Sequence, residues 1–339
     1  MLYATTRSDR DVFTVQRALT EKTAPDGGFY VPFRETRFTR EQLEISEQSS
    51  QQENMAQLLS LMFKTRLTAW DLEFTAGRKP LRVEKIGRRI AVGERWHNTG
   101  GEFSCLVQNL TERLCSQDAL PGEPGIWAET ACSIASLFAL FALMRQQGYR
   151  QEDAPVDLAA EEGNLLTVVS GWFARSWGLP IGKILCGCRE NGVLWELTHT
   201  GELRTQGLTE RSCYPGLEML IYCCGGRWET ERLQDACFAE LPYKPGDNTL
   251  RRLHQGLGVS VVSDRRIMTV IPSVYSAHGY ILHPRAVLPY AGLLDDRART
   301  GAGSWGLVIA DQDPARDCTA VAAALGITEQ AARDRLKNR

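Results

Sequence analysis

Two pairs of cysteines are the first groups in this sequence that could do chemistry. Cys186 and Cys188 form a Cys-x-Cys pair in the apolar segment KILCGC, and Cys223 is followed directly by Cys224. Residues i and i+2 of a strand lie on one face, so Cys186 and Cys188 could bind one metal ion. The usual Cys-x₂-Cys spacing of zinc sites is absent, however. We therefore expect buried thiols and no metal site.

A nucleophile and an anion site are two further possibilities, both between residues 97 and 105. Cys105 follows His97 closely, and a thiolate beside an imidazole is a known catalytic pairing. Thr99-Gly100-Gly101 precedes a predicted helix, whose N-terminus could bind an anion. Simpler interpretations are a core cysteine on an apolar helix face and an ordinary turn with an N-cap. We prefer these simpler interpretations.

These groups would be positioned by alternating strands and helices. Residues 219–222 form one further short apolar run within this alternation. Strands separated by helices predict an α/β fold, with a parallel sheet covered by helices on both faces. We predict helices at residues 41–64 (one or two), 103–115, 126–147, 163–176, 228–240, 318–325 and 328–336, strands at 155–158, 184–188 and 307–310, and a hairpin at 83–96.

Composition limits the classes of function. The 339 residues are 43% apolar and 24% charged, as in a globular protein large enough for two domains. The net charge of −2 predicts no general attraction to nucleic acid or to a membrane. Met1–Arg10 is too polar for a signal peptide, and the longest apolar run, Cys132–Met144, is too short to span a bilayer. We expect a cytoplasmic protein with reduced cysteines.

The start of the chain carries a more specific pattern. Leu2–Pro32 reads LYATTRSDRDVFTVQRALTEKTAPDGGFYVP. This resembles the N-terminal signature of the threonine synthase family: a Tyr-x-Ser/Thr-Thr-Arg start, a short helix and a loop close to APDGGLYVP. The segment from Ala24 to Pro32 departs from that loop only at Phe29.

Three later stretches extend the resemblance. Residues 163–201 are similar to the family's GNFG loop, helix, Gly-Leu-Pro turn and following segment. Residues 278–290, HGYILHPRAVLPY, resemble its HGY-x-x-x-P-H-x-A-V-A-Y pattern, with Arg285 in place of the second histidine. Residues 305–317 take the place of its strand and TAHPAKF loop, with Asp311 for the threonine. The resemblance implies the family's pyridoxal-phosphate-dependent fold of type II, similar to tryptophan synthase beta.

The resemblance fails at the residue that would carry the chemistry. The family holds pyridoxal phosphate as a Schiff base on a lysine in a segment close to FHGPTLAFKDF. The best register sets Trp96-His97 on its Phe-His, so Ser104 stands where the lysine is expected. A serine hydroxyl cannot form that imine. Lys79 or Lys85 could replace the lysine, but their polar surroundings favour exposed surface positions.

Other parts of the family's cofactor site are altered too. The small domain with its Ser-Gly-Asp-Thr-Gly phosphate loop has no counterpart between Ser104 and the apolar helix, so we expect that domain to be deleted. The glycine-asparagine loop reads Gly163-Asn164, and the preceding Glu161 and Glu162 would repel a phosphate. We therefore expect Ser104, Gly163, Asn164 and Asp311 to mark a degenerate pocket, with no catalytic residue.

These observations define two hypotheses for a truncated, degenerate family member. Residues 1–82 would form the N-terminal domain, and residues 83–339 the large α/β domain. The first hypothesis is a pseudoenzyme without pyridoxal phosphate, acting as a binding or regulatory partner or holding an amino-acid-like ligand. The alternative is a divergent carbon–oxygen lyase that acts with pyridoxal phosphate on a phosphorylated amino acid such as O-phosphohomoserine. Loss of a domain exposes apolar surface, which predicts a homo-oligomer or a protein partner.

Overall fold

The computed structural model describes residues 2–34, 37–76, 81–96, 107, 110–111, 124–151 and 154–337. Several predictions therefore lie outside the described residues. These are the roles of Lys79, His97, Ser104 and Cys105, the turn at 99–101 and most of the helix at 103–115.

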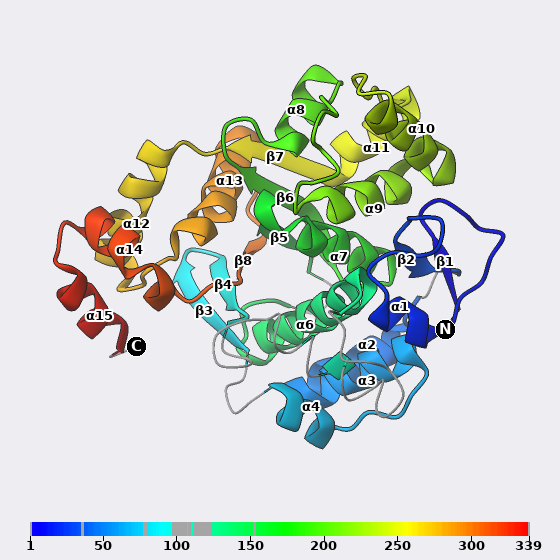
Figure 1. The fold of residues 1–339 in the computed structure, drawn as a ribbon. Coiled ribbons are helices and arrows are strands. Elements are labelled where there is room, and N and C mark those ends of the chain that lie inside the picture. Colours follow the sequence, from blue (N-terminus) through cyan, green and yellow to red (C-terminus); the bar gives the residue numbers. More distant parts are fainter. Residues whose placement is uncertain are drawn as a thin grey trace.

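A six-stranded sheet forms the centre of the molecule (Figure 1). Its order is β3 (Arg82–Gly87), β4 (Ile90–Glu94), β8 (Trp305–Ala310), β5 (Val156–Glu161), β6 (Ile181–Cys188) and β7 (Leu257–Val261). Strands β3 and β4 pair antiparallel, which confirms the predicted hairpin, and all the other pairs are parallel. The carboxyl ends of β4, β8, β5, β6 and β7 therefore lie along one edge of the sheet.

Helices cover both faces of this sheet, as the sequence predicts. Alternate side chains of one strand enter different cores: Leu158 joins the apolar cluster that contains α6 (Ile126–Gln146) and α7 (Leu165–Ser176), and Ala159 joins the cluster of α13 (Pro284–Thr300). Helix α13 approaches β6 closely, because a methyl group at Gly187 would collide with the Leu288 carbonyl.

Helix α6 confirms the predicted buried apolar helix. It is the one helix in the described part of the chain with the length and hydropathy to cross a membrane. Within the fold, 83% of its most apolar 18-residue window is buried. Side chains on different sides of α6, including Ile134, Ala135 and Leu137, are fully buried. This is the burial expected of a central core helix.

The N-terminal part packs against α6. Strands β1 (Tyr3–Thr5) and β2 (Tyr30–Pro32) pair antiparallel, and the helices there are α1 (Val15–Thr20), α2 (Arg40–Gln48), α3 (Gln51–Phe63) and α4 (Ala69–Ala76). Helices α2 and α3 confirm the prediction for residues 41–64. A capping box between Ser50 and Glu53 starts α3. Leu59 of α3 and Leu137 of α6 share one apolar cluster, so the proposed domain boundary at residue 82 stays a prediction.

Helices α10 (Arg227–Phe238), α14 (Cys318–Leu325) and α15 (Glu329–Lys337) confirm the predictions for residues 228–240, 318–325 and 328–336, and other elements were not predicted. The apolar run at 219–222 is the middle of a buried helix. The sequence did not assign it, because short buried helices and buried strands have similar sequences. Among the residues described between β4 and α6 there is no strand, and the loss of the small domain stays a prediction. The other elements are η1 (Glu162–Asn164), α8 (Val193–Thr200), α9 (Tyr214–Gly225), α11 (Asp247–Gly256), α12 (Asp264–His278) and η2 (Pro314–Asp317).

Candidate functional site

The candidate site lies where β4, β8 and β5 end at the carboxyl edge of the sheet. Ligands of open α/β sheets bind in the crevice outside this edge. Glu94 pairs with Ala310 in the β4–β8 register, so the next residues, Arg95 and Asp311, are neighbours. The backbone N–H of Arg95 continues the pairing by donating to the Ala310 carbonyl at 3.0 Å.

The Arg95 side chain is completely buried at this edge. Its Nη1 donates to Ser133 Oγ at 2.8 Å and to Ser136 Oγ at 3.2 Å, both on α6. Its Nη2 donates to Thr167 Oγ1 of α7 at 2.6 Å. A buried guanidinium requires such hydrogen bonds together with a counter-charge.

Asp311 supplies the counter-charge and links Arg95 to the predicted pocket. Its Oδ1 accepts from Arg95 Nε at 2.5 Å, and its Oδ2 accepts from Asn164 Nδ2 at 2.7 Å. The structure thus brings the predicted residues Asn164 and Asp311 into contact. Sequence reasoning missed Arg95, although a charged residue directly after a buried strand is a usable signal. The Arg95 cluster, as we define it, consists of Arg95, Ser133, Ser136, Asn164, Thr167 and Asp311.

A second charged pair lies beside the Arg95 cluster. Arg285 Nε donates to Glu161 Oε2 at 2.9 Å, and a methyl group at the predicted residue Gly163 would collide with the Arg285 guanidinium. Burial raises the pKa of Glu161 to about 7; the charge of Asp311 adds to this rise, and Arg285 opposes it. The neighbouring Glu162 accepts from Leu194 N at 2.7 Å, at the start of α8.

The raised pKa of Glu161 predicts a pH-dependent stability. The folded state binds its proton more tightly than the unfolded chain, so this contribution to stability is full below about pH 4.5 and is lost as the pH rises through about 7. Glu161→Gln should remove this loss of stability at high pH, because glutamine does not ionise. Between pH 5 and 8 the variant should gain about 2 kcal/mol of unfolding free energy relative to wild type. Urea unfolding across this range measures the effect.

A matched control is Glu210→Gln, which changes an exposed carboxylate elsewhere. It should leave the dependence of unfolding free energy on pH as in wild type. Equal pH slopes for wild type and Glu161→Gln would contradict the assignment.

The cysteines of the C-x-C pair are buried, which confirms the expectation for them. Burial raises the pKa of the Cys188 thiol to about 12 and raises that of Cys186 well above its ordinary value, so neither is a thiolate at neutral pH. In the described ranges, no three His, Cys, Asp or Glu side chains form a group that could hold a metal ion.

Lys85, Lys183 and Lys244 have described partners outside the Arg95 cluster. Lys85 is exposed on β3, with its Nζ 5.9 Å from the centroid of the Trp305 ring. Lys183 pairs with Asp296 at 2.9 Å, and Lys244 with Glu202 at 3.2 Å. The exposed position predicted for Lys85 is confirmed.

Comparison with known proteins relates this fold to one family. A family model described as "Threonine synthase N terminus" matches residues 2–77. "Threonine synthase-like 1" of Homo sapiens is 25% identical over 166 residues, covering 45% of this chain and 22% of that protein. "Threonine synthase" of Methylobacillus glycogenes is 33% identical over 81 residues, covering 24% of this chain and 16% of that protein. Over these regions the chain is similar to the threonine synthase family.

Solved threonine synthases share its fold. Pyridoxal-phosphate-bound threonine synthase from Brucella melitensis superposes with a TM-score of 0.78 at 17% identity, covering 99% of this chain and 94% of that one. Threonine synthase from yeast gives a TM-score of 0.81 at 13% identity, with the same coverage. The matched region is about a fifth of the length of the human relative, so activity and substrate do not transfer with the fold.

The N-terminal signature of the threonine synthase family serves the fold here. Arg7 donates from Nε and Nη2 to the two oxygens of Glu218, at 3.1 and 3.0 Å, and Glu218 is completely buried in α9. Thr6 Oγ1 donates to the same carboxylate at 2.5 Å. The APDGG loop folds over Arg7, because Nη1 donates to the Asp26 carbonyl at 3.2 Å and a Cβ at Gly28 would lie 2.9 Å from Arg7 Cγ.

The HGY segment of the family also has a structural use. His283 is buried at the N-cap of α13, where its Nδ1 accepts from Arg285 N at 3.1 Å. Burial lowers the pKa of His283 to about 4, so the ring is neutral and able to accept this bond. This bond gives His283 a structural role at the start of α13.

Proposed function

We propose that this threonine synthase family member does not use pyridoxal phosphate and acts as a binding or regulatory partner. The Arg95 cluster carries the proposal. It fills the edge between β4, β8 and β5 with a guanidinium whose charge and hydrogen bonds are met by the chain itself. A cofactor in the same place would have to displace that buried ion pair, at a cost of several kcal/mol.

The surrounding charges also do not fit pyridoxal phosphate. Its phosphate would lie near the Gly163-Asn164 loop, where backbone N–H groups begin α7. Glu161 and Glu162 directly precede that loop, and both carboxyls are largely buried. Arg285 offsets the charge of Glu161 at this loop, so Glu162 is the acidic group that raises the cost of bringing a phosphate there. In the sequence register, Ser104 offers no amine for an imine.

The alternative proposal is a divergent lyase acting on a phosphorylated amino acid such as O-phosphohomoserine. It is favoured by the similarity of the fold to a threonine synthase that binds pyridoxal phosphate. It requires a lysine other than the missing one at position 104, and Lys79 is a candidate by sequence.

Titration with pyridoxal phosphate, followed by borohydride reduction and peptide mapping, separates the two proposals. We expect weak labelling spread over exposed lysines such as Lys64 and Lys85. The threonine synthase of Brucella melitensis, treated in parallel, is the positive control. A saturable imine trapped on one lysine, together with threonine formed from O-phosphohomoserine, would establish the lyase.

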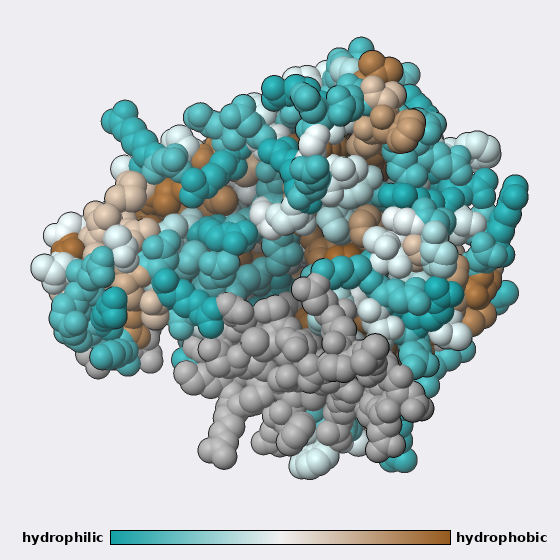
Figure 2. All heavy atoms as spheres, in the orientation of Figure 1, coloured by the Kyte–Doolittle hydropathy of each residue, from teal (hydrophilic) through white to brown (hydrophobic). Residues whose placement is uncertain are grey.

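We further propose a cytoplasmic protein that forms a homo-oligomer or binds a protein partner, not a nucleic acid or membrane. Figure 2 shows apolar surface near α10, where Trp228, Phe238 and Leu241 are 71%, 95% and 61% exposed. Exposed apolar groups of this size favour a covered surface in the working protein. Light scattering measures the oligomeric state. A monomer at every concentration would rule out the homo-oligomer and leave binding to a different protein as the remaining proposal.

A further inference from the structure

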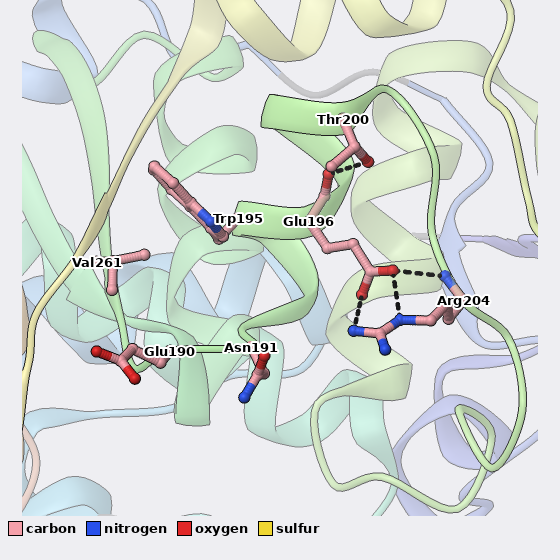
Figure 3. Close-up of a pocket in the computed structure, with 7 residues that line it drawn as sticks. All are labelled: Glu190, Asn191, Trp195, Glu196, Thr200, Arg204 and Val261. Atoms are coloured by element: carbon pink, nitrogen blue, oxygen red, sulfur yellow. Dashed lines mark hydrogen bonds and ion pairs between the residues drawn. The ribbon is translucent and has the colours of Figure 1, made fainter.

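A pocket of about 500 Å³ lies on the same edge of the sheet, at β6 and β7, the two strands that follow β5 in the sheet order. Figure 3 shows its walls. Glu190 and Asn191 follow β6, and Val261 ends β7, so the pocket lies outside the carboxyl ends of two parallel strands. Pockets in this position and of this size commonly bind small ligands. The lining residues are Glu190, Asn191, Trp195, Glu196, Thr200, Arg204 and Val261.

One wall of the pocket is fixed by an internal ion pair. Glu196 Oε1 accepts from Arg204 Nε at 2.8 Å and from Arg204 N at 3.1 Å. Thr200 Oγ1 donates to the Glu196 carbonyl at 2.7 Å. These bonds hold the turn after α8 in place, and Arg204 neutralises the charge of Glu196.

The charge of Glu190 is not neutralised in the same way. Within the described ranges, Glu190 has no ion pair, and the adjacent Arg189 pairs with Asp264 at 3.0 Å. The lining residues carry the charges of Glu190, Glu196 and Arg204, which give a net charge of −1. The pocket therefore favours a ligand with a single positive charge.

The opposite wall is apolar and aromatic. Trp195 and Val261 lie on the same side of the pocket as Glu190 (Figure 3). Trp195 is half-buried, so much of its indole is held in place by the fold. His199 packs against the indole, with the ring centroids 3.1 Å apart. An indole and a carboxylate on the same side of a pocket suit an ammonium group, through cation–π attraction and charge.

We propose that this pocket binds a small organic cation, with a substituted ammonium group on Glu190 and an apolar stem against Trp195 and Val261. Because the pocket shares no residue with the Arg95 cluster, the proposal holds whether or not the chain uses pyridoxal phosphate. The proposed cation would bind outside the edge between β4, β8 and β5, so the Arg95 cluster would keep its contacts.

The test uses choline as the probe and the full chain labelled with ¹⁵N. Choline should shift the Trp195 indole N–H signal saturably, with a dissociation constant on the order of 1 mM for so small a ligand. Trp195→Phe assigns the signal. Glu190→Gln should weaken binding by at least about tenfold, because it removes a charge-assisted contact while keeping the shape. Glu210→Gln, which changes an exposed carboxylate outside the pocket, should bind choline as wild type does.

The neutral alcohol 3,3-dimethylbutan-1-ol has nearly the shape of choline without its charge. It should bind at least about tenfold more weakly than choline. Equal affinity for the alcohol, unchanged choline affinity in Glu190→Gln, or no saturable shift with choline would each overturn the proposal. Saturable binding of acetate at the same indole signal would also overturn it, since the pocket would then select anions.

Discussion

Arg95→Leu should destabilise the protein by about 3–5 kcal/mol. The change removes the buried partner of Asp311, whose carboxylate is only 15% exposed. Ser133 and Thr167 also lose the donor that each receives from the guanidinium. A buried acceptor without a donor costs free energy beyond the lost bond itself. Urea unfolding at neutral pH measures the loss.

A double variant separates the charge effect from the packing effect. Arg95→Leu with Asp311→Asn removes both charges, so it should be more stable than either single variant, with a coupling free energy of about 2 kcal/mol. Arg333→Ala is the control, because its partner Glu329 lies 3.6 Å away and both side chains are exposed. That control should cost less than about 0.5 kcal/mol. If Arg95→Leu lowers the unfolding free energy as little as Arg333→Ala does, the Arg95 cluster no longer supports our proposed function.

The residues that depart from the family pattern come with partners of opposite charge. Asp311 stands where the pattern has threonine, and it pairs with Arg95. Arg285 stands where the pattern has histidine, and it pairs with Glu161. Each departure alone would leave a charge at the sheet edge without a counter-ion. Together they form a consistent set, in which the charges at this edge are balanced within the chain.

The sequence predicted most of the sheet and part of the candidate site. Asn164 and Asp311 were predicted because the resemblance placed both in the cofactor pocket, and they are in contact. Arg95 was not predicted, since burial of an arginine depends on Asp311, which is 216 positions further along the chain. Local sequence favours an exposed position for arginine. Only the strand register brings the two residues together.

The missed helices and the missed strand have a similar cause. Helices α12 and α13 contain Pro272 and Pro289, which read as helix ends in a sequence. Strand β7 lies at the edge of the sheet and is only partly buried, so its apolar signal is weak. In each case the packing against α13 or β6 decides the structure, and local propensity does not. The cation pocket depends on β7 and could not be predicted without it.

Arg7→Ala should cost about 3–5 kcal/mol, as much as the loss of Arg95. Glu218 is fully buried, and Arg7 provides its two charge-assisted hydrogen bonds. Without Arg7, the Glu218 carboxylate still accepts the hydrogen bond from the Thr6 hydroxyl, but it loses the positive charge of Arg7. The APDGG loop also loses the side chain over which it folds. Urea unfolding gives the total cost.

Hydrogen exchange shows where that cost falls. The exchange of amides in β1 and β2 should speed up first, while that of α13 should change only with global stability. The variant Arg7→Met with Glu218→Gln is the matched control, because it removes both charges and should recover much of the stability. If Arg7→Ala speeds exchange equally in β1 and α13, the variant lowers global stability only. The contact of Arg7 with Glu218 would then have no local effect on the N-terminal segment. Protection lost in β1 and β2 alone would show that this family signature fastens the segment to α9, independently of any cofactor.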